Sequence, residues 1–129
     1  MHAWATMPPR DLLQRTAIFA IGVTRFVRTL PATDEAREIA GQLRRAANGV
    51  RSNYRAARKG RSRAEFEAKL GTACEEADEC VGWFEHLRET RIANHPVLLD
   101  ESNQLLKILS QALITSKENS ARLKKLAKS

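Results

Sequence analysis

The chain has 129 residues, about the size of one domain, with 22 Lys and Arg against 15 Asp and Glu, a formal net charge of +7 and a pI near 10.0. This charge favours anionic partners, first nucleic acid and then a membrane surface, while an aromatic content of 5% argues against a platform that stacks bases. Uncharged runs such as TAIFAIGVT are too short to span a membrane and the N-terminus lacks the basic start of a signal peptide, so we expect a cytoplasmic protein.

Four segments have the periodicity of amphipathic helices, and we expect helices near residues 10–29, 34–59, 63–92 and 98–126. Their apolar and small residues recur in steps of three and four, which is typical of the seam of a left-handed bundle. No stretch alternates with the period of two that indicates a strand. The sequence therefore predicts an all-α, antiparallel up-and-down four-helix bundle that forms one domain over residues 1–129. The seam positions are, in chain order, Leu12, Thr16, Phe19, Val23, Phe26 and Leu30, then Ala36, Ala40, Leu43, Ala47, Val50, Tyr54 and Ala57, then Phe66, Leu70, Ala73, Ala77, Cys80, Phe84 and Leu87, and finally Leu98, Ser102, Leu105, Leu109, Ala112, Ser116, Asn119, Leu123 and Leu126.

The segments between these helices carry the residues that begin and end helices. Thr33 is suited to cap the second helix, and Ser62 with Glu65 forms a capping box for the third. Gly60 is a candidate for the left-handed residue that follows a helix, and Pro96 blocks continuation of the third helix. A hairpin folded about residues 60–62 then places small residues opposite each other at its middle, so we expect a close approach of the second and third helices there.

The stretch QLRRAANGVRSNYRAARKGRSR, residues 42–63, holds eight basic residues and no acid. A row of guanidinium groups suits phosphate oxygens, because arginine presents a planar fork of donors. The stretch is therefore a candidate nucleic-acid surface, whose residues are Arg44, Arg45, Arg51, Arg55, Arg58, Lys59, Arg61 and Arg63.

The alternative is that acids of the third helix neutralise this stretch. In the predicted hairpin, Arg44 and Arg45 fall level with Asp78 and Glu79, and Arg55 falls level with Glu67. On this interpretation the first part of the stretch is paired internally. The turn end, from residue 58 to residue 63, keeps free charge in either case.

Two further features lie outside the seam, and the first bears on assembly. The first and last helices carry second apolar stripes, which indicate either burial against another copy of the chain or a broader core face. The C-terminal KENSARLKKLAKS adds a second basic patch. The stripes consist of Leu13, Ala17, Ala20 and Val27 and of Leu99, Leu106 and Leu113, and the patch of Lys117, Arg122, Lys124, Lys125 and Lys128.

No constellation of catalytic or metal-binding residues is present in the sequence. The acid run EEADE, residues 75–79, lacks the second acid cluster on a facing helix that a magnesium site would need, and the Glu-x-x-His, HExxH, GxSxG and glycine-rich phosphate-loop motifs are absent. Cys74 and Cys80 lie six residues apart on one helix and are too far apart to bridge, so we expect buried free thiols. The sequence therefore predicts a protein that is not an enzyme and has neither a cofactor nor a metal site.

Residues 30–87, from LPATDEAREIAG to ECVGWFEHL, carry a family likeness. Their QLRRAA core, the NYRAAR segment, the SRAEF…KL helix start and the EADE run before an aromatic pair resemble the four-helix-bundle proteins encoded in intervening sequences of bacterial 23S rRNA genes. The accessory variability determinant (Avd) of diversity-generating retroelements belongs to the same group.

This resemblance implies a homopentamer with a basic surface, which in the retroelement members is associated with binding nucleic acid and a reverse transcriptase. By position, the residues carried over are Arg44, Arg45, Arg51, Arg55 and Arg58. We therefore expect a homo-oligomer that binds the backbone of RNA or DNA, and the resemblance adds the expectation of a role as accessory factor to a reverse transcriptase. A structural or protein-interaction module with no nucleic-acid role is the alternative.

Overall fold

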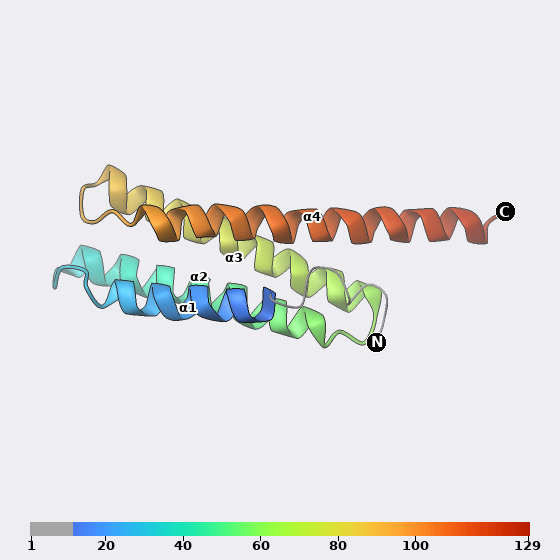
Figure 1. The fold of residues 1–129 in the computed structure, drawn as a ribbon, viewed down its shortest axis with the longest axis horizontal. Coiled ribbons are helices and arrows are strands. Elements are labelled where there is room, and N and C mark those ends of the chain that lie inside the picture. Colours follow the sequence, from blue (N-terminus) through green and yellow to red (C-terminus); the bar gives the residue numbers. More distant parts are fainter. Residues whose placement is uncertain (1–11) are drawn as a thin grey trace.

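The computed structural model describes residues 12–129, which fold into four α-helices without a strand (Figure 1). The helices are α1 (Leu12–Val27), α2 (Asp34–Arg58), α3 (Arg63–Glu89) and α4 (Pro96–Ala127). The α2–α3 interface is the most extensive, α3 also packs on α4 and α1 on α2, and α1 meets α4 over few residues. The predicted all-α four-helix bundle is confirmed. None of these helices combines the length and the hydropathy that a membrane span requires.

The predicted seam forms the core. The largest fully buried side chains include Tyr54, Phe19, Phe66, Leu43 and Leu70, all of them seam positions. The seam is exposed only at the end of α4, where Asn119, Leu123 and Leu126 lie on the surface. Figure 1 shows the reason: α4 continues past the end of the bundle, so its last turns have no neighbouring helix.

The predicted helix caps are present. Thr33 accepts a hydrogen bond from the backbone N–H of Ala36 at 3.1 Å, and Ser62 accepts one from Glu65 at 3.1 Å. Each bond satisfies a backbone donor that the first turn of a helix otherwise leaves unpaired. These caps explain why α2 and α3 begin where the sequence predicts.

Other helix boundaries differ from the prediction. The first two residues predicted for the first helix lie outside the described residues, and α1 and α2 end one or two residues early. Helix α3 ends at Glu89 rather than near residue 92, because Arg91 adopts a positive φ of 62°. The backbone carbonyl of Leu87 then accepts hydrogen bonds from the N–H groups of Ile92 and Ala93. Pro96 is the first residue of α4, two residues before the predicted start, since a first-turn proline has no N–H to leave unsatisfied.

Gly60 has a role other than the predicted one. No described glycine adopts a positive φ, so Gly60 is not a left-handed residue. A Cβ at this position would lie 3.1 Å from the carbonyl oxygen of Ala57 and from the backbone nitrogen of Phe66. The tight packing of the α2–α3 turn therefore favours Gly60 over a residue with a side chain.

The middle of the α2–α3 hairpin is closely packed, as predicted. Ala47 and Ala77 are fully buried there, and a Cβ at Gly49 would lie 2.8 Å from the carboxyl carbon of Glu76. The contact between Gly49 and Glu76 agrees with the predicted hairpin register to within about two residues. Small residues thus bring these two helices together.

The second apolar stripes mostly belong to a broader core face. The α4 stripe, Leu99, Leu106 and Leu113, is half-buried against the core, while Leu13 on α1 is 39% exposed. Other apolar side chains are more exposed than those of the stripes, and on α1 the most exposed of them is Ile18, at 63%.

Candidate nucleic-acid interface

The predicted basic residues all lie at or near the surface of α2 and of the α2–α3 turn. Arg58 and Arg63 are half-buried, and the other six are exposed: Arg44, Arg45, Arg51, Arg55, Lys59 and Arg61. The structure thus places a run of positive charge along one helix and around its C-terminal end.

The predicted pairing between α2 and the acids of α3 is wrong. Within residues 12–129, no ion pair joins Arg44, Arg45 or Arg55 to a carboxylate. Glu67, the predicted partner of Arg55, instead accepts a hydrogen bond of 2.7 Å from the hydroxyl of Ser116 on α4.

The reason is that the α2 arginines face α1 rather than α3. Arg51 and Arg55 line a hollow of about 220 Å³ together with Leu13, Thr16 and Ala17 of α1. Asn48, Arg51 and Arg55 are separated by three and four residues, which places them on one face of α2. Extending that spacing by four residues toward the N-terminus brings Arg44 onto the same face.

A second hollow of about 290 Å³ lies between the same two helices. It is lined by Ala20, Ile21, Thr24 and Arg25 of α1, by Arg28 directly after that helix, and by Asn48 of α2. We call the two hollows together the α1–α2 groove. None of the described residues that line it is acidic.

Sequence reasoning missed Arg25 and Arg28 of this groove. They lie outside the conspicuous basic stretch, in a helix whose other residues are mostly apolar. The available signal was their spacing of three residues, which sets the two side chains on neighbouring faces where α1 ends.

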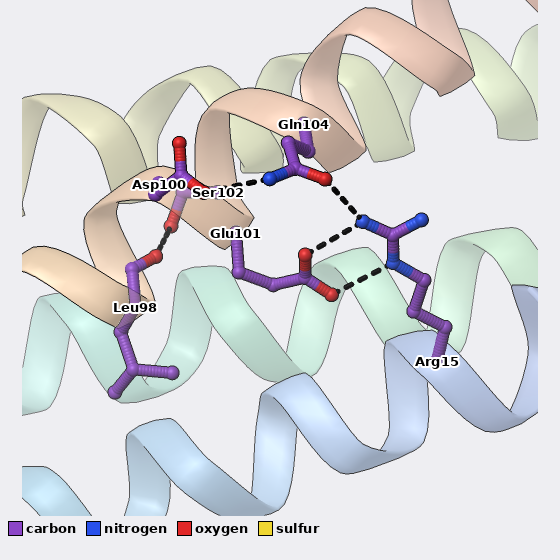
Figure 2. A network of polar contacts seen from close by, with 6 residues as sticks. All are labelled: Arg15, Leu98, Asp100, Glu101, Ser102 and Gln104. Carbon is purple, nitrogen blue, oxygen red and sulfur yellow. Dashed lines mark hydrogen bonds and ion pairs between the residues drawn. The ribbon is translucent and has the colours of Figure 1, made fainter.

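Arg15 differs from the groove arginines because it joins two helices. Its guanidinium contacts both carboxylate oxygens of Glu101 on α4, at 2.7 and 2.8 Å, and donates to Gln104 at 2.9 Å (Figure 2). Gln104 in turn donates to Asp100 at 2.6 Å. This network connects α1 to α4 where the two helices share little apolar contact.

The α2–α3 turn is only partly available to a ligand. Arg63 donates a hydrogen bond of 3.0 Å to the backbone carbonyl of Ser116, so this member of the predicted surface braces α3 against α4. Lys59 and Arg61 are exposed.

The projecting end of α4 lies at the same end of the bundle as this turn (Figure 1). After Ser116 no residue of α4 is buried. The exposed basic side chains of this segment are Lys117, Arg122, Lys124, Lys125 and Lys128.

Reactive side chains do not gather into a second kind of site in the described part of the chain. No group of three or more His, Cys, Asp or Glu residues there could hold a metal ion. Cys74 and Cys80 are free thiols, as predicted, and burial is the main cause that raises the pKa of each. Both therefore stay protonated near neutral pH, although Cys74 is only partly buried. The absence of enzymatic activity stays a prediction.

Comparison with known proteins identifies the family. The sequence profile of the 23S rRNA-intervening sequence proteins matches residues 10–111, which is most of the chain. The chain belongs to this family. No curated protein matches the chain significantly.

The fold of this family member resembles a solved structure. The chain is similar to a Bacteroides thetaiotaomicron protein of unknown function from the S23 ribosomal protein family, with a TM-score of 0.70 and 24% sequence identity. The similarity covers 78% of this chain and 93% of the other. The family match ends at residue 111, so the last turns of α4 and their basic side chains lie outside the matched residues.

Proposed function

We propose that the chain binds the phosphate backbone of RNA or DNA through the basic surface of α2. The observation that supports this most directly is that Arg44, Arg51 and Arg55 are exposed and form no ion pair within the described residues. Guanidinium groups without internal partners remain available to phosphates, and such contacts read backbone rather than sequence.

The basic end of the bundle adds to this surface. Lys59 and Arg61 of the turn lie at the same end as the projecting part of α4 (Figure 1). Helices that run antiparallel bring together two basic segments that are far apart in sequence. A long polyanion would contact both.

We also propose that the chain acts as a homo-oligomer, with a pentamer as the form that the family resemblance implies. Exposed apolar residues on two helices support self-association, since Ile18 of α1 is 63% exposed and Ile114 of α4 is 49% exposed. Five copies of a chain with a net charge of +7 would carry a charge of about +35, which attracts polyanions over a long range. Association with a reverse transcriptase is a further proposal from the resemblance to Avd.

The test is the salt dependence of binding to a generic RNA or DNA hairpin. Binding should weaken steeply between about 50 and 200 mM salt, because phosphate contacts release counterions. Reversing charge with Arg51→Glu and Arg55→Glu should abolish binding while leaving the circular dichroism spectrum unchanged. Lys69→Glu with Lys107→Glu is the matched control, because it makes the same change in net charge at exposed sites on α3 and α4. Absence of wild-type binding at 50 mM salt would exclude the proposed function.

A protein-interaction module is the second candidate, favoured by the exposure of Ile18. An apolar side chain on the outside of α1 suits the surface of another protein. Ile18→Asp should then remove a stoichiometric protein partner without affecting the fold. A variant that keeps its partner would contradict this function.

A further inference from the structure

We propose that the α1–α2 groove holds the sugar–phosphate backbone of one polynucleotide strand lengthwise, with Arg25 and Arg28 as phosphate ligands that no sequence pattern assigned. The inference rests on the proposed function and specifies where and how the polyanion lies. It predicts that the strand runs along the bundle between two helices, rather than only across the basic turn at its end.

The arrangement of charge supports a strand that lies along the helices. Arg51 and Arg55 line the hollow near the start of α1, and Arg25 and Arg28 line the hollow near its end. On α2 the face from Arg44 to Arg55 covers a rise of about 16 Å, because each helical residue adds about 1.5 Å. Arginines thus border the groove from both helices and at both ends.

The groove floor favours a backbone over a bulky occupant. Small side chains such as Ala17 and Ala20 line it, so a narrow chain can approach closely.

The hydrogen-bonding groups of the groove leave the arginines as the main donors. The hydroxyls of Thr16 and Thr24 donate within α1, to the carbonyls of Leu12 and Ala20, at 2.9 Å in each case. Asn48 is exposed beside Arg25 and Arg28 and offers an amide to a sugar hydroxyl or a base edge. Arginine forks match phosphate oxygens in geometry as well as charge.

The charge of the α1–α2 groove also favours an anionic ligand. The described residues that line the groove carry four positive charges and no negative charge. Like charges on one surface repel each other, and a bound polyanion relieves that repulsion. Oligonucleotide should therefore raise the midpoint of thermal unfolding as well as bind.

The experiment compares two double variants by fluorescence anisotropy with a labelled single-stranded oligouridylate of about 15 nucleotides. Arg25→Gln with Arg28→Gln should weaken binding about 25-fold at about 0.1 M salt, because each lost phosphate contact costs about 5-fold there. The slope of log K against log salt should become shallower by about 1.4, since each contact on a single strand contributes about 0.7. Lys69→Gln with Lys107→Gln removes the same charge from α3 and α4 and should leave the slope unchanged.

A second variant separates charge from folding. Arg25→Lys with Arg28→Lys keeps the charge and loses the donor fork, so it should keep the salt slope and lose only part of the affinity. If this variant lost as much slope as the glutamine variant, the effect would come from damage to α1 and the proposal would fail.

The remaining outcomes also decide the matter. Suppose that Arg51→Glu with Arg55→Glu abolishes binding, while Arg25→Gln with Arg28→Gln binds as well as the Lys69→Gln, Lys107→Gln control. The groove proposal then fails and the proposed function stands. If the wild-type chain does not bind the oligouridylate at 50 mM salt, both fail. If Arg25→Gln with Arg28→Gln changes the oligomeric state in light scattering without changing binding, the groove is a contact between copies of the chain and the proposal is overturned.

Discussion

The interface between α2 and α3 is extensive and built from small and apolar side chains, whereas the shorter contact between α1 and α4 includes a charged network. In the first pair, Leu43, Ala47, Ala77 and Cys80 are all buried. In the second, the guanidinium of Arg15 contacts both carboxylate oxygens of Glu101, with the two side chains 33% and 26% exposed (Figure 2).

This difference explains why one set of arginines is used within the fold and another is not. Arg15 and Arg63 lie where α4 passes, and each donates to an acceptor on that helix. Arg51 and Arg55 lie on the side of α2 that faces α1, and the described residues of α1 include no acid that could pair with them. The position of an arginine relative to α4 therefore decides whether it braces the bundle or remains available to a ligand.

The largest expected effect comes from opening the apolar interface. Leu43 is fully buried, so Leu43→Ala should lower the free energy of unfolding by about 2–5 kcal/mol through lost burial and a residual cavity. Urea denaturation followed by circular dichroism measures it. As the control, Val97→Ala at a 73% exposed site should change stability by less than about 0.5 kcal/mol. Equal effects would contradict the assignment of the core.

A smaller effect is expected from the charged network. Glu101→Gln removes a charge-assisted, two-point contact that is partly exposed to solvent, so the loss should be about 1 kcal/mol. The loss should shrink at about 1 M salt, because screening weakens the wild-type pair. The comparison is Asp34→Asn, whose pair with Arg37 is exposed and 3.6 Å long and should contribute almost nothing. If the two variants were equally stable, the Arg15–Glu101 pair would contribute no more to stability than an exposed ion pair.

Periodicity predicted the fold and the core because the spacing of apolar residues within each helix indicates which face is buried. The α2 arginines show what periodicity leaves open. Arg51 and Arg55 lie beside the apolar seam, and a seam has a neighbouring helix on each side. Which neighbour they face depends on the handedness of the bundle, and the alternative that paired Arg55 with Glu67 of α3 is wrong.

Sequence patterns also did not predict the contacts between segments that are far apart in the chain. Arg15 and Glu101 are 86 residues apart, and neither stands out in its own helix. Gly60 has the composition of a left-handed cap, yet it is favoured by the closeness of Ala57 and Phe66. Sequence patterns thus located the basic stretch, while the groove that Arg25 and Arg28 complete depends on how α1 docks.

The smallest expected effect tests the one carboxylate that intrudes on the apolar interface. Glu76 lies against Gly49, and burial raises its pKa above the ordinary value, with smaller contributions from Glu79 and Glu75. A raised pKa means that the charged form is disfavoured in the folded state. Stability should therefore fall as pH rises from the unfolded-state pKa of about 4.3 through the higher folded-state value.

Glu76→Gln removes that dependence. The variant and the wild type should unfold at similar temperatures near pH 3, where Glu76 is protonated in both states. At pH 7 the variant should be the more stable, by no more than the roughly 0.5 kcal/mol typical of surface changes. Thermal unfolding at both pH values measures the difference, and Glu85→Gln on the exposed face of α3 is the control. A variant less stable than wild type at pH 7 would mean that Glu76 makes a favourable contact across the interface, and the contrast between an apolar α2–α3 pair and a charged α1–α4 pair would no longer hold.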